Sequence, residues 1–361
     1  MGLTDHHFVP TKWVLLNICK DDPAPITEND IFMFLKVDST GRFLVRSMPW
    51  FGNRDYFLPG TTNDGLLLLG KTTYPYQARL VNPFTGSVAH FKASIPRRGV
   101  WGVAVTTSPI FRVFISGKER ENGIMWADPD SECFHEILAV NLDGPLCMAP
   151  LAGNVYLANT YGSILSPSPD VADGSLFPTL NTIIPNPENL QPESLENGRY
   201  YLVESGGDLF LVTRPCRDLP KELVVRRVDI TKRVLEPVRD IGDCALFVIH
   251  IRCLAVNASK FPTVEGGCVY FVDPVIRFGR CSYKSSFMTM FRVADGVQHR
   301  MFYDLTTIGG YSAPSTLTLQ FAEYCNYIPY LELHQCTFEE EEFWDDFEGD
   351  QASSLMMNLL D

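Results

Sequence analysis

The chain has 361 residues, of which 45% are hydrophobic and 20% are charged, and its formal net charge is -13 at pH 7. A chain of this size and composition can bury a large core, so we expect it to fold without disulfides or structural metal. Nine acidic residues and no Lys or Arg lie in 339–361, which leaves a net charge of only -4 for the rest. A nearly neutral body lacks a broad basic face, and this excludes extensive nucleic-acid binding.

The sequence also indicates the compartment. The N-terminal residues lack the basic and then apolar pattern of a signal peptide. The longest apolar stretch, around 244–251, is interrupted by His250 and is too short to span a bilayer. Ten cysteines include no C-x-x-C pair, which argues against zinc-ribbon and thioredoxin-like sites, and those in apolar runs are expected to be buried thiols. We therefore expect a cytoplasmic or nuclear protein with no membrane association.

Short strands are predicted from the N-terminus onward. The first three are expected at 12–19, 31–37 and 42–46, because apolar runs there are separated by Pro and Gly. Turns at 36–43, 80–86 and 126–130 have centres about 45 residues apart, a spacing typical of four-stranded propeller blades. Later turns follow less regularly, at 153–154, 206–207 and 295–296. Helical periodicity is confined to short pieces at 220–226 and near the C-terminus, so the sequence predicts an all-β fold.

The clearest single hairpin lies at Tyr200–Thr213. Two strands rich in β-forming residues flank Gly206-Gly207, and adjacent glycines permit the positive φ angles of a tight primed turn. The following segment, Ile241–Asp273, contains three short apolar runs at 245–250, 253–256 and 268–272. Phe261-Pro262 and Gly266-Gly267 separate the second run from the third, and we expect three antiparallel strands here.

The order of residues in Ile241–Asp273 resembles the plant family of KIB-type β-propellers, which usually follow an F-box. The residues that carry the resemblance are Gly242, Asp243, Ala245, Leu246, Phe247, Phe261, Pro262, Cys268, Val269, Tyr270, Phe271 and Asp273. Weaker similarity extends over roughly 64–304. The resemblance implies a single β-propeller, and a chain of this length accommodates six or seven four-stranded blades. We place a flexible N-terminus at 1–9, the propeller at 10–335 and a disordered acidic tail at 336–361.

One departure from the family bears on function. Its members commonly begin with an F-box, a helical module that binds the Skp1 adaptor of a ubiquitin ligase, whereas the first 60 residues here predict strands. We therefore expect no direct Skp1 binding. The resemblance implies a non-enzymatic protein-interaction module that binds an unidentified protein partner, either as an orphan adaptor or as a decoy that occupies its targets.

No catalytic, cofactor-binding or metal-binding motif is recognisable. Ser205 lacks the surrounding glycines of a nucleophile elbow and is explained by the hairpin turn. The alternative is a propeller enzyme acting on a small molecule or glycan, which requires two carboxylates to converge at the propeller centre. The acidic residues considered for that role are Glu204, Asp208, Asp243 and Asp273.

The C-terminal tail offers a further alternative. Phe343, Trp344 and Phe347 alternate with carboxylates, a pattern typical of segments that fold onto a partner and of transcriptional activation segments. These three aromatic residues are the candidate partner-binding residues, and a transcriptional co-regulator acting through the tail is the corresponding function. A solvated tail that only aids solubility is the simpler interpretation, since most charge runs have this role.

Overall fold

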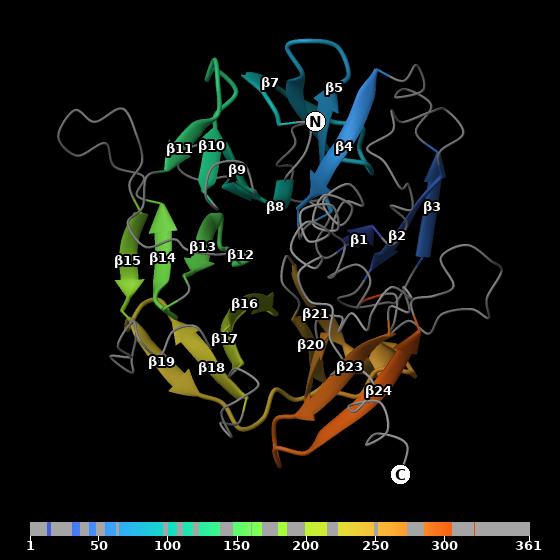
Figure 1. Cartoon of the computed structure of the whole chain (residues 1–361), viewed down its shortest axis with the longest axis vertical. Coiled ribbons are helices and arrows are strands. Elements are labelled where there is room, and N and C mark those ends of the chain that lie inside the picture. Colours follow the sequence, from blue (N-terminus) through green and yellow to red (C-terminus); the bar gives the residue numbers. More distant parts are fainter. Residues whose placement is uncertain are drawn as a thin grey trace, which may run out of the picture.

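The computed structural model describes residues 13–15, 31–36, 43–47, 55–62, 65–96, 100–106, 111–117, 123–137, 147–159, 161–167, 180–185, 199–214, 223–248, 252–272, 285–304 and 321. These residues form 24 strands in six sheets, which are arranged around a common centre (Figure 1). Every sheet is built from consecutive strands, and the fold is an all-β propeller. The predicted domain boundaries and the acidic tail lie outside the described residues.

The sheets are called blades 1 to 6 in chain order. Blade 1 contains β1 (Trp13–Leu15), β2 (Ile31–Lys36) and β3 (Phe43–Ser47). Blade 2 contains β4 (Tyr56–Thr61), β5 (Leu67–Lys71), β6 (Gln77–Val81) and β7 (Val88–Ser94). Blade 3 contains β8 (Val100–Thr106), β9 (Arg112–Gly117), β10 (Ile124–Ala127) and β11 (His135–Ile137).

The second half of the propeller continues in the same way. Blade 4 contains β12 (Cys147–Leu151), β13 (Asn154–Ala158), β14 (Ile164–Pro167) and β15 (Leu180–Ile184). Blade 5 contains β16 (Arg199–Ser205), β17 (Asp208–Arg214), β18 (Val224–Asp229) and β19 (Val234–Pro237). Blade 6 contains β20 (Cys244–Val248), β21 (Cys253–Asn257), β22 (Cys268–Val272), β23 (Ser285–Arg292) and β24 (Gln298–Asp304).

Blades 2 to 5 are antiparallel meanders with the strand nearest the centre first. Their first strands contact one another in sequence, β4 with β8, β8 with β12 and β12 with β16, and β16 then contacts β21 of blade 6. The predicted Tyr200–Thr213 hairpin is confirmed as β16 and β17, with Gly206 and Gly207 both at positive φ. Four of the six sheets have four strands. Blade 1 has three among the described residues, and blade 6 has five.

Blade 1 packs against a different neighbour on each side. Leu15 and Phe34 belong to the same core cluster as Leu67 and Leu69 of blade 2. The residues next to them in sequence, Val14 and Leu35, pack into a cluster with Phe247 and Tyr270 of blade 6. Successive side chains of a strand point to opposite faces, so one pair of short strands covers both neighbouring blades. Apolar packing between the first and last blades thus closes the ring.

Blade 6 corrects one prediction. The strands β20 and β21 are antiparallel as expected, but β22 pairs with β20 in parallel, giving the strand order β21-β20-β22-β23-β24. Two parallel neighbours need a crossover connection rather than a hairpin. The chain provides it through β21 and the 3₁₀ turn η4 (Ala258–Lys260). The predicted short helix at 220–226 is also wrong where the structure describes it, because 224–226 lie in β18 and pair with β17.

Backbone contacts within Ile241–Asp273 hold this crossover in place. The amide of Ala258 donates to the Asp243 carbonyl at 2.8 Å, and that of Gly267 donates to the Cys244 carbonyl at 2.9 Å. A Cβ atom on Gly266 would lie 3.1 Å from the Asp243 Cα, so this position has no room for a side chain without displacing the backbone. The motif therefore encodes a change of strand order inside blade 6.

Aromatic packing completes the crossover. Phe261 directly follows η4, is 1% exposed and meets Phe321 edge to face at 5.3 Å between ring centroids. Phe247 of β20 stacks on Tyr270 of β22 at 4.7 Å, which joins the parallel pair through their side chains as well as their backbones. The hydroxyl of Tyr270 accepts the Glu265 N–H at 2.8 Å.

Removing the Phe261 ring is expected to destabilise the propeller strongly. Phe261→Ala leaves a cavity in a fully buried site and should lower the free energy of unfolding by about 3–5 kcal/mol. Val297→Ala is the control, because Val297 is 39% exposed and its truncation should change stability by no more than about 0.5 kcal/mol. Urea denaturation followed by circular dichroism measures both. Equal midpoints for the two variants would contradict the assigned packing.

Burial also predicts a loss of stability at alkaline pH. Desolvation raises the pKa of Tyr270 to about 12, while an unfolded tyrosine titrates near about 10. Between these values the unfolded chain loses this proton and the folded chain keeps it, so stability falls as pH rises from about 10 to about 12. Tyr270→Phe should make that fall shallower, as measured by thermal midpoints at successive pH values in reducing buffer. If the thermal midpoint of Tyr270→Phe fell with pH as steeply as that of the unsubstituted protein, the raised pKa of Tyr270 would be refuted as the cause.

Candidate functional site

Two buried cysteines meet where β12 and β21 begin. The Sγ atoms of Cys147 and Cys253 lie 3.3 Å apart, and Cys147 also donates a hydrogen bond to the Leu202 carbonyl of β16 at 3.3 Å. Arg252, which is 6% exposed, precedes β21 and lies near Gly60 of β4. The described residues contain no cluster of three or more His, Cys, Asp or Glu side chains that could hold a metal ion.

The carboxylates considered for a glycosidase pair serve local turns or face solvent. Glu204 accepts the Gly207 N–H at 2.9 Å and so stabilises its own hairpin. Asp208 is exposed at the same turn, and Asp243 is exposed before β20. Asp273 lies outside the described residues. Ser205 has its hydroxyl 3.1 Å from the Cys244 thiol, with no histidine in that contact. Among the described residues, Glu204, Asp208 and Asp243 therefore show no pairing of the kind that a glycosidase uses as acid and base.

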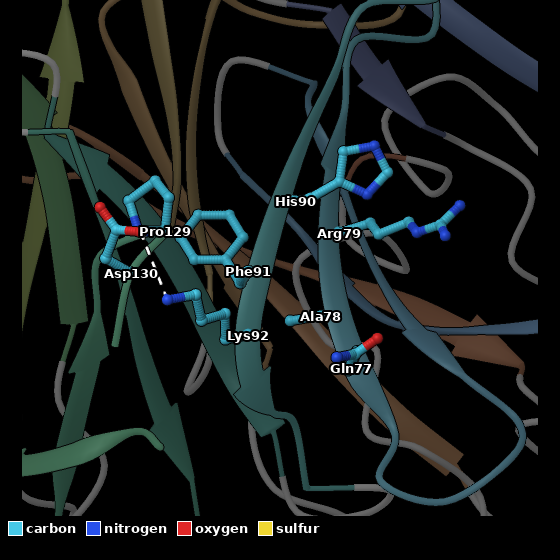
Figure 2. A pocket seen from close by; sticks show the side chains of 8 residues that line it. All are labelled: Gln77, Ala78, Arg79, His90, Phe91, Lys92, Pro129 and Asp130. Carbon is cyan, nitrogen blue, oxygen red and sulfur yellow. Dashed lines mark ion pairs between the residues drawn. The ribbon is translucent and has the colours of Figure 1, made fainter. Parts of the chain in front are cut away.

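A surface groove of about 330 Å³ lies between blades 2 and 3. Figure 2 shows the eight side chains that line it, which come from β6, β7 and the turn between β10 and β11: Gln77, Ala78, Arg79, His90, Phe91, Lys92, Pro129 and Asp130. Ala78 and Phe91 are buried, while His90 and Lys92 are exposed. Phe91 points toward Pro129, whereas His90 and Arg79 point to the other side of the sheet (Figure 2).

Backbone and side-chain contacts connect the two walls of the groove. The Lys92 amide donates to the Pro129 carbonyl at 3.3 Å. The Lys92 ammonium lies 3.6 Å from carboxylate oxygens of both Asp130 and Glu132. These ion pairs are exposed and contribute little to stability, so the charges remain available to a ligand. The eight groove residues include no Ser, Cys or Thr.

An exposed tyrosine lies in the turn that leads into β6, the first strand that lines this groove. Tyr74 lies three residues before Gln77, in the turn between β5 and β6, and 86% of its surface is exposed. The turn is held by backbone hydrogen bonds, since the Tyr76 amide donates to the Thr73 carbonyl at 2.9 Å and the Tyr76 carbonyl accepts from Ile95 at 3.0 Å. The Tyr74 ring meets the Tyr76 ring edge to face at 6.2 Å. We call Tyr74 and the eight groove residues the blade 2 surface.

Sequence reasoning missed the blade 2 surface. Tyr74-Pro75-Tyr76 was visible as two aromatics around a proline, but nothing local distinguishes an exposed ring from a buried one. The groove joins residues from two blades and has no motif. The candidate residues drawn from the sequence, Phe343, Trp344 and Phe347, lie outside the described residues. Among the described residues, no helix has the length and apolar character that crossing a membrane requires.

Comparison with known protein families agrees with the fold. A family model described as "KIB1-4 beta-propeller" matches residues 52–292. This range includes the whole of Ile241–Asp273 and ends at the last residue of β23. No curated protein matches the chain.

Two solved structures are similar at low identity. One is the β-propeller domain of the Trilobed protease from Pyrococcus furiosus, at 11% identity and a TM-score of 0.32, over 77% of this chain and 79% of that one. The other is GH43B of the xyloglucan PUL of Bacteroides ovatus, at 11% identity and a TM-score of 0.26. That match covers 70% of this chain and spans about half of the other, 52%.

Proposed function

The chain belongs to the KIB1-4 β-propeller family, and on that premise we propose that it is a non-enzymatic protein-interaction module. Its propeller binds a protein partner through the blade 2 surface, as the partner-binding part of an adaptor or as a decoy. The single observation that carries the proposal is Tyr74, a large aromatic side chain that is 86% exposed on a hydrogen-bonded turn beside a groove.

Physical chemistry supports this use of Tyr74. Tyrosine offers a large contact area and loses few rotamers on binding, so it is common among the residues that dominate binding energy. A ring held on a turn by backbone hydrogen bonds also needs little reorganisation when a partner arrives. The neighbouring groove supplies the cations Arg79 and Lys92 and the carboxylate of Asp130, which can orient the partner through polar contacts at the rim.

The described residues of the inner strands favour binding over hydrolysis. Propeller enzymes need an open polar site with converging catalytic groups, whereas Cys147, Cys253 and Arg252 are buried at or next to the start of β12 and β21. Glu204, the candidate carboxylate on an inner strand, is engaged by the amide of its own turn. We accordingly propose a protein partner that binds outside the ring, and we expect neither a cofactor nor nucleic acid to take part.

Substituting Tyr74 tests the proposal. Tyr74→Ser should reduce capture of the partner by about 10-fold or more, the loss typical of a dominant interface residue. Val234→Ser is the matched control, because Val234 is also an exposed apolar residue, at 40%, but lies on β19 of blade 5. Quantitative affinity purification from the source cells, with reciprocal capture by the purified partner, measures the effect.

The outcomes separate the alternatives. Equal capture by both variants, or equal loss in both, would refute the assignment to blade 2. Skp1 and cullin among the captured proteins would connect the propeller to a ubiquitin ligase, and a discrete partner without them would support an adaptor or decoy role. Hydrolysis of a glycan or small molecule by the purified protein would overturn the proposal as a whole.

We also propose that the acidic tail contributes a second contact through Phe343, Trp344 and Phe347. The support is the alternation of aromatic and acidic residues in 339–348. Replacing all three aromatics by Ala should weaken partner capture, whereas replacing Met356 and Met357 should not. Full capture by the triple variant would leave the tail as a solubilising segment. Activation of a reporter by 336–361 fused to a DNA-binding domain would favour a co-regulator role.

A further inference from the structure

Two buried thiols from non-adjacent blades meet near the centre of the propeller. Cys147 is the first residue of β12 in blade 4, and Cys253 is the first residue of β21 in blade 6. Their side chains are 4% and 5% exposed, and both belong to one apolar core cluster. The inner strand of blade 5, β16, lies between them in chain order and accepts a hydrogen bond from Cys147 through the Leu202 carbonyl. The contact therefore joins three consecutive blades.

The hydrogen bonds distinguish the two sulfurs. Cys147 donates its S–H to the Leu202 carbonyl at 3.3 Å, and its sulfur also lies 3.3 Å from the Cys253 sulfur. The contact with Cys253 lowers the pKa of Cys147, against the opposing effect of desolvation. A thiolate is the reactive form of cysteine. The short contact places the two sulfurs within reach of each other, so we assign Cys147 as the attacking sulfur and Cys253 as the one that resolves the product.

We propose that Cys147 and Cys253 are a peroxide-sensitive pair that forms an internal disulfide linking blade 4 to blade 6. The Cys147 thiolate attacks one oxygen of hydrogen peroxide, the O–O bond breaks, and the departing hydroxide takes up a proton to become water. The Cys253 sulfur then attacks the sulfenic acid, and an S–S bond forms as the S–O bond breaks and a second water leaves. Two thiols lose two electrons, and one peroxide gains them.

The geometry needs only a small adjustment. An S–S bond is about 2.0 Å long, so the sulfurs approach each other by about 1.3 Å from their present 3.3 Å. Peroxide suits the buried site because it is small. A bulky disulfide reagent would have to open the packed inner strands first.

Other described cysteines serve as internal controls. Burial and the Glu265 carboxylate raise the pKa of Cys268 to about 11, which keeps this thiol protonated and unreactive. Cys244 has a serine hydroxyl, that of Ser205, as its 3.1 Å partner rather than a second thiol. Cys133 is exposed and free. A selective reaction at Cys147 and Cys253 therefore differs from general oxidation, which would begin at exposed cysteines.

The test treats the full chain with hydrogen peroxide, blocks the remaining thiols by alkylation and maps disulfides by mass spectrometry of peptides. The expected result is a cross-linked pair of peptides containing Cys147 and Cys253, which disappears on reduction with dithiothreitol. The thermal midpoint should rise by roughly 5 °C, because a cross-link over a long loop restricts the unfolded chain. Cys147→Ala should abolish both effects, and Cys133→Ala should retain both.

Three results would overturn the proposal. The first is recovery of Cys147 and Cys253 as alkylated thiols under conditions that oxidise Cys133. The second is a disulfide between either residue and a different cysteine. The third is a cross-link that forms without a rise in the thermal midpoint, since a bond made only in unfolded molecules would not stabilise the ring. Peptide mapping of the unsubstituted protein decides these outcomes even if a cysteine variant fails to fold.

Discussion

The structure depends on covering both faces of blade 1. A sheet in a propeller is stable only if each face packs on a neighbour, and the first sheet has its second neighbour at the other end of the chain. Successive side chains along β1 and β2 point to opposite faces, so both faces of blade 1 are covered. Leu15 and Phe34 pack on blade 2, while Val14 and Leu35 pack on blade 6. Among the described residues, no strand pairs blade 1 with blade 6, so side-chain packing closes the ring.

Sequence predicted the parts of this fold that local chemistry determines. Gly206-Gly207 specified a primed turn, and the structure has both glycines at positive φ. The parallel pairing of β20 with β22 was not predictable in this way, because an apolar run such as 268–272 looks the same in either direction. The mistaken helix at 220–226 has a similar origin. Pairing of 224–226 with β17 overrides a weak local preference.

Functional residues were harder to predict than strands. The blade 2 surface combines β6 and β7 with a turn from blade 3. The Cys147 and Cys253 thiols are 106 positions apart in the sequence. A local sequence motif therefore could not have predicted either site. The packed inner strands and the exposed outer turns give the protein two distinct regions. The inner strands form a core that stabilises the ring, and the recognition site that we propose lies on outer turns, where substitutions cost little stability.

Ring closure through distant ends has a consequence for synthesis on the ribosome. Blades 2 to 5 are each made of consecutive residues, so every one can form soon after its own residues emerge. Blade 1 is made first, yet the apolar face with Val14 and Leu35 stays uncovered until Phe247 and Tyr270 of blade 6 have been translated. Until then the nascent chain exposes an apolar surface that is prone to aggregation. A chaperone that covers this surface would be needed at that stage.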